Sequence, residues 1–169
     1  YAVQLDGKRA HADFFTLCDA VLIIDDSEKK VSSSAGHALM NAHTYREARR
    51  QQAAANLHEM LQYLYAGSKM EFMRLIEHEA LSLHALMMAS RPGYVLIRPN
   101  TLIALEAISR FREEKGIPLG YTLDAGPNIH LIYFSDDRAE VIRFIEGELK
   151  PLCRSGRWID DAMGDGSRI

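Results

Sequence analysis

Two strand-like runs, at residues 119–123 and 129–134, are separated by a connection of only five residues. Leu119, Tyr121 and Leu123 alternate with smaller or polar neighbours, which is the period of a half-buried strand. The second run is apolar and rich in β-branched and aromatic residues, as strands usually are. So short a connection joins antiparallel neighbours. The sequence therefore predicts an antiparallel hairpin.

The connection itself reads Asp124-Ala125-Gly126-Pro127-Asn128. Asp, Gly, Pro and Asn are the ordinary residues of hairpin turns, so these five residues by themselves predict a turn and nothing more. The alternative is a functional carboxylate, because the glycine and the proline-fixed backbone would hold Asp124 in a defined place. The turn chemistry alone leaves both interpretations open.

Helical patterns fill most of the remaining chain. We expect helices at about 35–66, 69–89, 99–115 and 137–149. One of the serines Ser32, Ser33 and Ser34 is the expected N-cap of the first helix, and Gly67 its end. Ser68 with Glu71 is expected to form a capping box for the second helix. The apolar positions expected to face the core are Leu57, Met60, Leu61, Leu64, Phe72, Leu75, Ile76, Leu83, Leu86, Met87, Ile103, Ala107, Ile108, Phe111, Val141, Ile142, Ile145 and Leu149.

A continuous apolar run at residues 20–24 is a further predicted strand, and residues 1–5 are strand-like. The tail from 154 to 169 has no clear period. The order is then strand, three helices, two strands and a helix, which does not alternate strictly. We therefore predict an α+β fold, with helices packed on a small antiparallel sheet. At 169 residues the chain 1–169 is expected to be a single domain.

The totals exclude several classes of protein. A net charge of −3 gives no electrostatic support for nucleic-acid binding, which needs a basic face. No apolar run approaches the roughly 18–20 residues that span a bilayer, so no membrane partner is expected. Cys18 and Cys153 are expected to be free thiols of a protein in the reducing cytoplasm. The chain starts at Tyr1 and not at Met, so we expect it to be a piece of a longer protein.

Seven histidines raise the question of a metal site. His78 and Glu79 resemble the start of an HExxH zinc helix, but Ser82 stands where the second histidine would be. The next histidine, His84, is six residues away and points in a different direction on a helix. No Cys-x-x-Cys is present to supplement them. We predict no metal site and expect surface or core-edge histidines.

The serine-rich stretch at residues 31–37 supports two interpretations. Hydroxyl and backbone N–H groups at a helix start bind anions favourably. Equally, the stretch is a run of N-cap residues. It is a poor nucleotide loop, because it has one glycine and lacks both the Gly-x-Gly and the G-x-x-x-x-G-K patterns.

Three stretches, KVSSSAG at 30–36, EALSLHA at 79–85 and YTLDAGPN at 121–128, occur in this order. They are similar to the K-x-x-S-S/T-x-G, D-S-N-x-F-H-A and Y-T-x-D-A-G-P-N motifs, of which the last is specific. On these motifs the chain resembles the diphosphomevalonate decarboxylases of the GHMP kinase superfamily. The resemblance covers most of the chain but corresponds to the C-terminal half of that enzyme.

The resemblance implies an α+β C-terminal domain on the substrate side of a two-domain enzyme, whose N-terminal half carries the ATP phosphate loop. It implies Asp124 as the catalytic base, with Ser33, Ser34 and Gly126 contacting the substrate, mevalonate diphosphate. ATP and Mg²⁺ would be bound mainly by the N-terminal half, and family members commonly form homodimers. The implied reaction is ATP-dependent decarboxylation to isopentenyl diphosphate, in isoprenoid biosynthesis.

Two alternatives stay open. A related small-molecule kinase acting on mevalonate or its phosphate, without decarboxylation, would keep the same aspartate loop. A non-catalytic binding module would keep the fold without the chemistry. Because phosphoryl transfer depends on groups that position phosphates, residues 1–169 alone are expected to be inactive.

Overall fold

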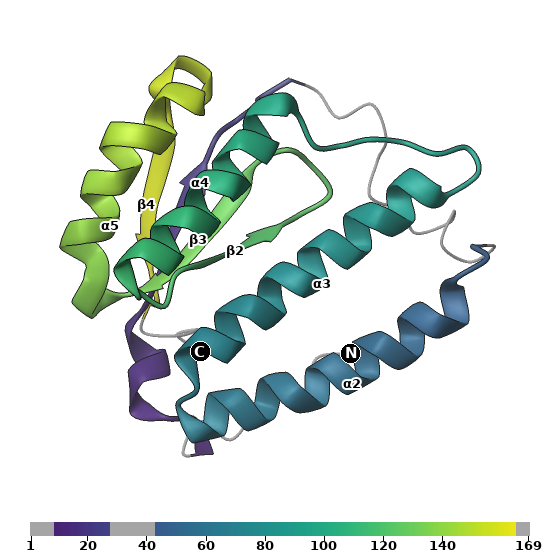
Figure 1. The fold of residues 1–169 in the computed structure, drawn as a ribbon, viewed down its shortest axis with the longest axis horizontal. Helices are drawn as coiled ribbons and strands as arrows, with labels where there is room; N and C mark the ends of the chain where they lie inside the picture. The colour runs from purple at the N-terminus through teal and green to yellow at the C-terminus, as the bar shows by residue number, and fades with distance from the viewer. Residues whose placement is uncertain (1–8, 28–42, 165–169) are drawn as a thin grey trace.

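The structure is a computed structural model that describes residues 9–27 and 43–164. Its described helices and strands, shown in Figure 1, follow the predicted order with one added strand. The strands are β1 (Leu17–Leu22), β2 (Gly120–Leu123), β3 (Ile129–Phe134) and β4 (Trp158–Ala162). The α-helices are α2 (Arg46–Ala66), α3 (Lys69–Ala89), α4 (Pro99–Lys115) and α5 (Arg138–Phe144). Short helical turns are η2 (Ala12–Thr16), η3 (Ser135–Asp137), η4 (Ile145–Leu149), η5 (Lys150–Leu152) and η6 (Arg154–Gly156).

The four described strands form one sheet in the order β2-β3-β1-β4. Every pair is antiparallel, and the predicted hairpin is confirmed, with Leu123 opposite Ile129. Strand β1 is internal to the sheet, and its Leu22 lies opposite Ile129 of β3 on one side and Trp158 of β4 on the other. The α+β prediction is therefore confirmed, and the loop that contains Asp124 lies at the end of an edge hairpin.

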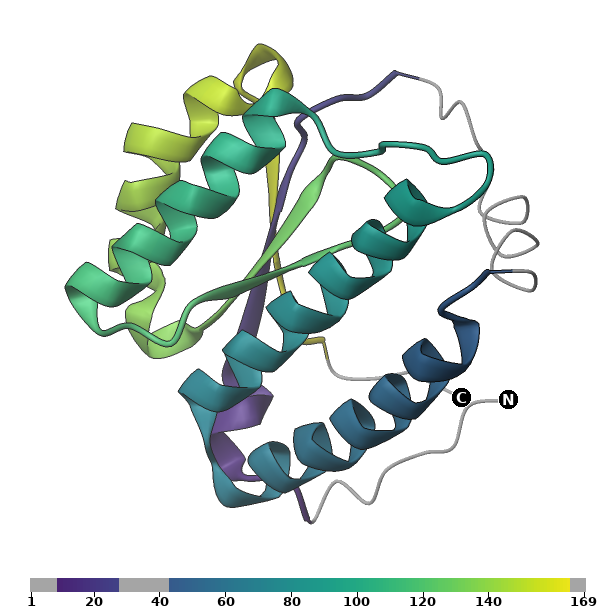
Figure 2. The same ribbon diagram turned by 45° about the vertical axis from the view of Figure 1, so that its right-hand side comes forward.

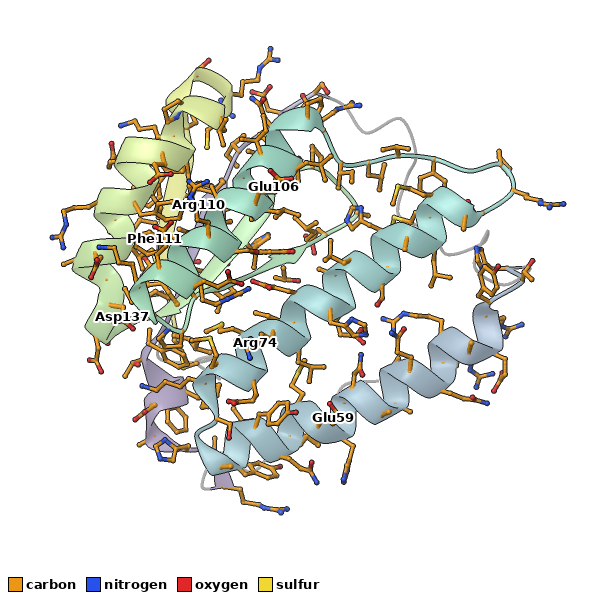
Figure 3. The ribbon with its side chains drawn as sticks, in the orientation of Figure 1. Glu59, Arg74, Glu106, Arg110, Phe111 and Asp137 are labelled. Carbon is orange, nitrogen blue, oxygen red and sulfur yellow. The ribbon has the colours of Figure 1, made fainter. Side chains whose placement is uncertain are left out.

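Helices α4 and α5 cover one face of the sheet (Figures 1 and 2). Their apolar sides meet alternate residues of the strands, such as Ala20 and Leu131, in the larger hydrophobic core. Between the helices Phe111 stacks on Phe144, with ring centroids 4.1 Å apart. Figure 3 shows Phe111 on the side of α4 that faces α5. This core fixes the sheet and the start of α4 against each other.

Helix α3 runs along the β2 edge, and α2 packs on the far side of α3 (Figure 2). Gly120 of β2 marks the close approach of α3, because a Cβ there would lie 2.8 Å from the Cβ of Met73. Met73 also forms a smaller core with Phe14 and Phe134. The edge of the sheet nearest to Asp124 is thus covered by α3.

The packing of α2 agrees with the predicted apolar stripe only in part, since Leu64 packs on the smaller core but Leu57 does not. Leu57 is 58% exposed, and the buried residue of this helix is Asn56. Arg49 and Asn56 bind the carboxylate of Glu79 on α3, and Gln52 donates to Ser82 at 3.2 Å. Besides the apolar packing of Leu64, the α2–α3 contact therefore contains a polar network, which apolar periodicity cannot predict.

Helix ends follow local chemistry in most places. Gly67 and Gly116 end α2 and α4 in the left-handed region, at φ of 76° and 67°. The capping box predicted at Ser68 is wrong, because its side chain makes no cap bond. The Ser68 N–H instead donates to Tyr63 at 3.0 Å, which closes the end of α2. Its ψ of 76° also lies outside the extended conformation usual for an N-cap.

Three other boundaries need correction. Strand β1 covers 17–22 in place of 20–24, and residues 43–45 are not helical, so in the described part the first helix begins at Arg46. The tail from 154, which has no clear period, contains β4. Ile103 on α4 is 51% exposed, and Ala104 is buried in its place. Residues 1–5 and the helical prediction for 35–42 lie outside the described residues.

Both cysteines are free thiols, as predicted, and both are buried. Burial raises the pKa of Cys18 and of Cys153 above the ordinary value, so the thiol forms are favoured. Within residues 9–27 and 43–164, none of the helices has the length and apolar character needed to cross a membrane.

Candidate functional site

The loop between β2 and β3, residues 124–128, presents Asp124 at the surface. Asp124 is exposed, whereas Gly126 two residues later is buried. The Gly126 N–H donates to the Asp124 carbonyl oxygen at 2.7 Å, which closes a tight turn. The turn predicted from the sequence is therefore present, and it points its acidic side chain outward.

Three side chains from other parts of the fold hold this loop. His84 of α3 donates from Nε2 to the Asp124 carbonyl oxygen at 3.0 Å. Thr101, which is fully buried in the first turn of α4, donates from its hydroxyl to the Pro127 carbonyl at 2.9 Å. Asn128 accepts at Oδ1 from the Ile24 N–H at 2.9 Å, just beyond β1. The loop is thus tied at both ends to the rigid elements around it.

The His84 contact defines the state of the imidazole. A carbonyl oxygen can only accept, so Nε2 must carry the proton. His84 is 2% exposed, and burial lowers its pKa below the ordinary value, although the bond to the Asp124 carbonyl acts in the opposite direction. The side chain is therefore a neutral imidazole that acts as a hydrogen-bond donor.

The far end of the loop, at Asn128, also bonds to the backbone of a second acidic residue, Asp25. Asn128 Oδ1 also accepts from the Asp25 N–H at 3.1 Å. The Asp25 carboxylate accepts from the Ser27 N–H at 2.9 Å and from Arg98 Nε at 3.2 Å. The Ser27 bonds, with Arg98 adding to them, lower the pKa of Asp25 to about 2. Asp25 therefore stays ionised and paired, and its role here is to hold residues 25–27 in place.

The Asp124 carboxylate differs from that of Asp25 in having no such partner among the described residues. Among residues 9–27 and 43–164 no side chain or N–H group binds its oxygens. An exposed carboxylate on a backbone held by several bonds has its lone pairs open to an incoming hydroxyl group. This arrangement suits a base or a hydrogen-bond acceptor for a ligand.

Of the other predicted site residues, the structure describes Gly126 but not Ser33 or Ser34. Gly126 lies in the same loop as Asp124, so the structure brings these two together. Ser33 and Ser34 lie outside the described residues. Among the described residues no three His, Cys, Asp or Glu side chains are grouped so that they could hold a metal ion.

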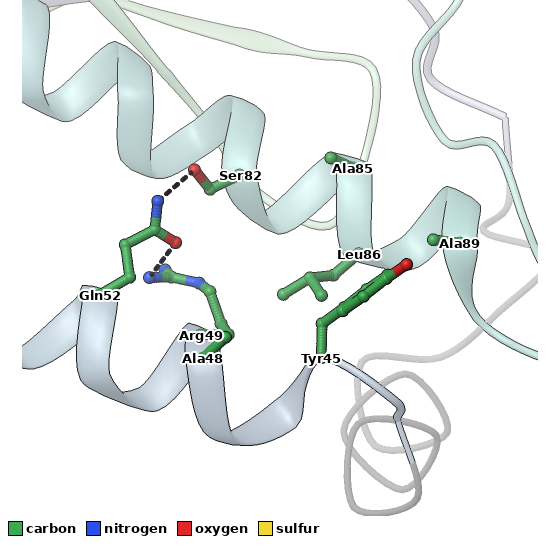
Figure 4. Close-up of a pocket in the computed structure, with 8 residues that line it drawn as sticks. All are labelled: Tyr45, Ala48, Arg49, Gln52, Ser82, Ala85, Leu86 and Ala89. Carbon is green, nitrogen blue, oxygen red and sulfur yellow. Dashed lines mark hydrogen bonds between the residues drawn. The ribbon is translucent and has the colours of Figure 1, made fainter.

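A separate cavity of about 540 Å³ opens between α2 and α3 (Figure 4). Its polar lining comes from Tyr45, Arg49, Gln52 and Ser82, and the rest is Ala48, Ala85, Leu86 and Ala89. Gln52 bridges the two helices, accepting from Arg49 and donating to Ser82. Neither Asp124 nor Gly126 lines this cavity, so it is distinct from the predicted catalytic loop.

Sequence reasoning missed the three residues that hold the loop. His84 was expected at the surface or at the edge of the core, yet it lies in the same buried row of α3 as Ala80 and Met87. That spacing was the available signal, since a polar residue on a buried helix face needs a hydrogen-bond partner. Thr101 and Asn128 carry no comparable signal, because their partners are 26 and 104 residues away.

Comparison with known proteins identifies the family. The model of the mevalonate 5-diphosphate decarboxylase C-terminal domain matches residues 20–162. The phosphomevalonate decarboxylase of Haloferax volcanii is 29% identical over 85 residues, which are 50% of this chain and 26% of that protein.

Solved structures share the fold over almost the whole chain. Mevalonate diphosphate decarboxylase from Staphylococcus aureus matches 98% of this chain and 48% of its own, with a TM-score of 0.84 and 21% identity. The enzyme from Legionella pneumophila matches 85% and 44%, with a TM-score of 0.77 and 30% identity. A third neighbour, at 21% identity and a TM-score of 0.76 over 88% and 44%, is a complex with mevalonate diphosphate, the ATP analogue AMPPCP and magnesium.

The chain spans about half the length of these solved structures. The family model nevertheless covers β1 from residue 20 onward, the helices α2 to α5, the hairpin with Asp124, and β4. The chain belongs to the mevalonate 5-diphosphate decarboxylase C-terminal domain family.

Proposed function

We propose that this chain is the C-terminal, substrate-side half of an ATP-dependent mevalonate diphosphate decarboxylase. The products would be isopentenyl diphosphate, ADP, phosphate and CO₂. ATP and Mg²⁺ would be bound mainly by an N-terminal half that is not part of the 169 residues. The family match over residues 20–162 and the complex of a neighbour with substrate, ATP analogue and magnesium support this proposal.

The observation that carries the proposal is the Asp124 loop. Its carboxylate is exposed, while its backbone is bonded to His84 and Gly126. A tertiary alcohol is a weak nucleophile, and its proton must be held or removed as the γ-phosphoryl group arrives. Asp124 is the residue of this chain that we propose for that task.

The remaining steps need little from this half of the enzyme. Departure of phosphate from the phosphorylated tertiary carbon leaves electron deficiency there, which the substrate carboxylate relieves by leaving as CO₂. A negatively charged group such as Asp124 can lie beside that carbon, because opposite charges attract. Gly126 would let the loop backbone approach the substrate, and Ser33 and Ser34 would also contact it. A homodimer remains a prediction from the family resemblance.

The test uses the full-length protein with ATP and mevalonate diphosphate. Release of phosphate and CO₂ is followed for the wild type and for Asp124→Asn. We expect the wild type to release both, and the variant to be slower by about a hundredfold or more, as is typical of losing a general base. Formation of ADP without release of CO₂ would mean that the protein is a kinase and not a decarboxylase. Turnover of ATP by residues 1–169 alone would contradict the assignment of the ATP site to the other half.

A second substrate is favoured by one observation. The relative from Haloferax volcanii is a phosphomevalonate decarboxylase. Mevalonate monophosphate should therefore be assayed beside the diphosphate, under the same conditions. A higher kcat/KM for the monophosphate would keep the chemistry of Asp124 and change the substrate.

A further inference from the structure

We infer that His84 is a positioning residue for catalysis, which acts by fixing the peptide of the catalytic base. The inference rests on the proposed function of Asp124. It starts from the carbonyl oxygen of Asp124, which accepts two hydrogen bonds, one from Gly126 within the loop and one from His84 on α3. The second bond joins groups that are 40 residues apart in the sequence.

The two bonds have different consequences for the side chain. The Gly126 bond lies within the turn and moves with it, so it cannot orient the loop relative to the rest of the domain. The His84 bond comes from the C-terminal half of a long helix that packs against β2. Since the carbonyl carbon and Cβ are both bonded to the same Cα, holding the carbonyl fixes the point from which the side chain starts and so limits where the carboxylate can lie.

The other two contacts do not duplicate this function. Thr101 holds Pro127, and Asn128 holds Ile24 and Asp25, so both act on the far end of the loop. His84 is the described side chain that bonds directly to the peptide of Asp124. Loss of its donor would leave the far end fixed and allow the near end to rotate.

The size of the expected effect follows from geometry. A displacement of about 1 Å of a catalytic group costs roughly a hundredfold in rate. The carbonyl would keep its bond from Gly126, so loss of the second bond should not by itself unfold the domain. His84→Leu is therefore expected to lower kcat by about tenfold to a hundredfold, with the KM for ATP unchanged.

Two variants test whether His84 supports the rate through its hydrogen-bond donor and not through its ring as such. The amide of glutamine reaches about as far as Nε2 and can donate to a carbonyl, so His84→Gln should recover most of the rate that His84→Leu loses. His78→Gln is the matched control, because His78 lies on the same helix but faces α2, where it bonds to Gln52. It should leave kcat unchanged.

A double-mutant cycle tells positioning from general damage. If His84 acts through the Asp124 carboxylate, His84→Leu should cost nothing further in an Asp124→Asn background. An equal loss in both backgrounds, or no loss with wild-type Asp124, would overturn the inference. Failure of Gln to recover activity while the variant folds would also overturn it.

A measurement without turnover keeps the test decisive if a variant fails to fold. In the wild-type protein, ¹⁵N NMR should show a neutral imidazole with its proton on Nε2 of His84. The amide of Gly126 should exchange faster with solvent in His84→Leu, which lacks the bond to the Asp124 carbonyl, than in the wild type, and His84→Gln should restore most of the protection. A proton on Nδ1 instead would overturn the inference whatever the activity.

The two failures are distinguishable. If the full-length wild type turns over neither mevalonate ester, the proposed function is wrong and the catalytic role of His84 falls with it. If the wild type is active and Asp124→Asn is impaired while His84→Leu is not, the proposed function stands and the inference alone is wrong.

Discussion

Helix α3 binds an arginine on each of its two sides, and the two ion pairs differ in burial. Glu77 pairs with Arg112 of α4, with side chains 10% and 8% exposed. Glu79 pairs with Arg49 of α2, with side chains 27% and 20% exposed. The first pair lies between α3, α4 and β2, where Arg112 also donates to the Leu119 carbonyl. The second lies in the polar contact between α2 and α3.

The pKa values of the two glutamates are shifted in opposite directions. Burial raises the pKa of Glu77 above its ordinary value of 4.5, and the bonds from Arg112 do not fully offset it. Burial acts on Glu79 too, but the bonds from Arg49 and Asn56 outweigh it and lower the pKa. A similar ion pair is thus costly on one side of α3 and mildly favourable on the other.

The largest effect expected is from breaking the buried pair. Arg112→Met leaves Glu77 as an uncompensated buried carboxylate and should lower the free energy of unfolding by about 3–5 kcal/mol. Arg49→Met, its match on the other side of α3, should cost no more than about 1 kcal/mol. Urea denaturation of the 169-residue chain measures both. Equal losses would show that the burial difference does not decide the energetics.

Burial should also decide the cost of truncating an isoleucine on α4, where Ile108 is buried and Ile103 is exposed. Ile108 is fully buried on α4, and Ile108→Ala should cost about 2–5 kcal/mol through lost transfer energy and the cavity left behind. Ile103 is on the same helix and 51% exposed, so Ile103→Ala should change stability by about 0.5 kcal/mol or less. Thermal unfolding of the two variants is the measurement, and a large loss at Ile103 would mean that a partner covers that face.

His84 should make stability depend on pH. Its pKa is lowered by burial, so near its ordinary value of 6.5 the unfolded chain binds a proton that the folded chain does not. The stabilisation is complete above pH 6.5 and is lost as the pH falls, by at most about 1.4 kcal/mol per pH unit. His84→Gln should have a flatter profile in urea titrations through this range. An unchanged profile would contradict a neutral buried imidazole.

The smallest effect is expected for Glu79. Because its pKa is lowered, its contribution is present above pH 4.5 and is lost as the pH falls further. Glu79→Gln should cost about 1 kcal/mol or less at neutral pH, and less in about 1 M salt, where the Debye length is near 3 Å. Glu77 has the opposite sign, since its raised pKa favours folding at acid pH. If salt does not reduce the cost of Glu79→Gln, the Arg49–Glu79 pair behaves like the buried Arg112–Glu77 pair.

Much of the fold could be predicted because its signals are local. Helices α3 and α4 and the hairpin follow from apolar spacing, from Gly67 and Gly116 at helix ends, and from the five-residue turn. The position of Asp124 at the end of the hairpin followed in the same way. The role proposed for it depended on a motif resemblance, because a turn residue and a catalytic residue look alike in composition.

Strand β4 and the polar contacts of α2 could not be predicted. All residues of β4 except Trp158 are exposed, so no alternation marks the strand, and its pairing with β1 alone defines it. Helix α2 is attached through Arg49 and Asn56, whose shared partner Glu79 is supplied by another helix. Patterns of apolar residues carry no information about either contact.

The sequence by itself determined which segments are helical, where the hairpin turns, and which carboxylate lies at its end, because backbone preferences and turn chemistry act over a few residues. The tertiary structure decided what holds that carboxylate. His84, Thr101 and Asn128 meet at residues 124–128 from α3, from α4 and from the contact with the end of β1. Hydrogen bonds between groups 26 to 104 residues apart exist only after the core has brought these elements together.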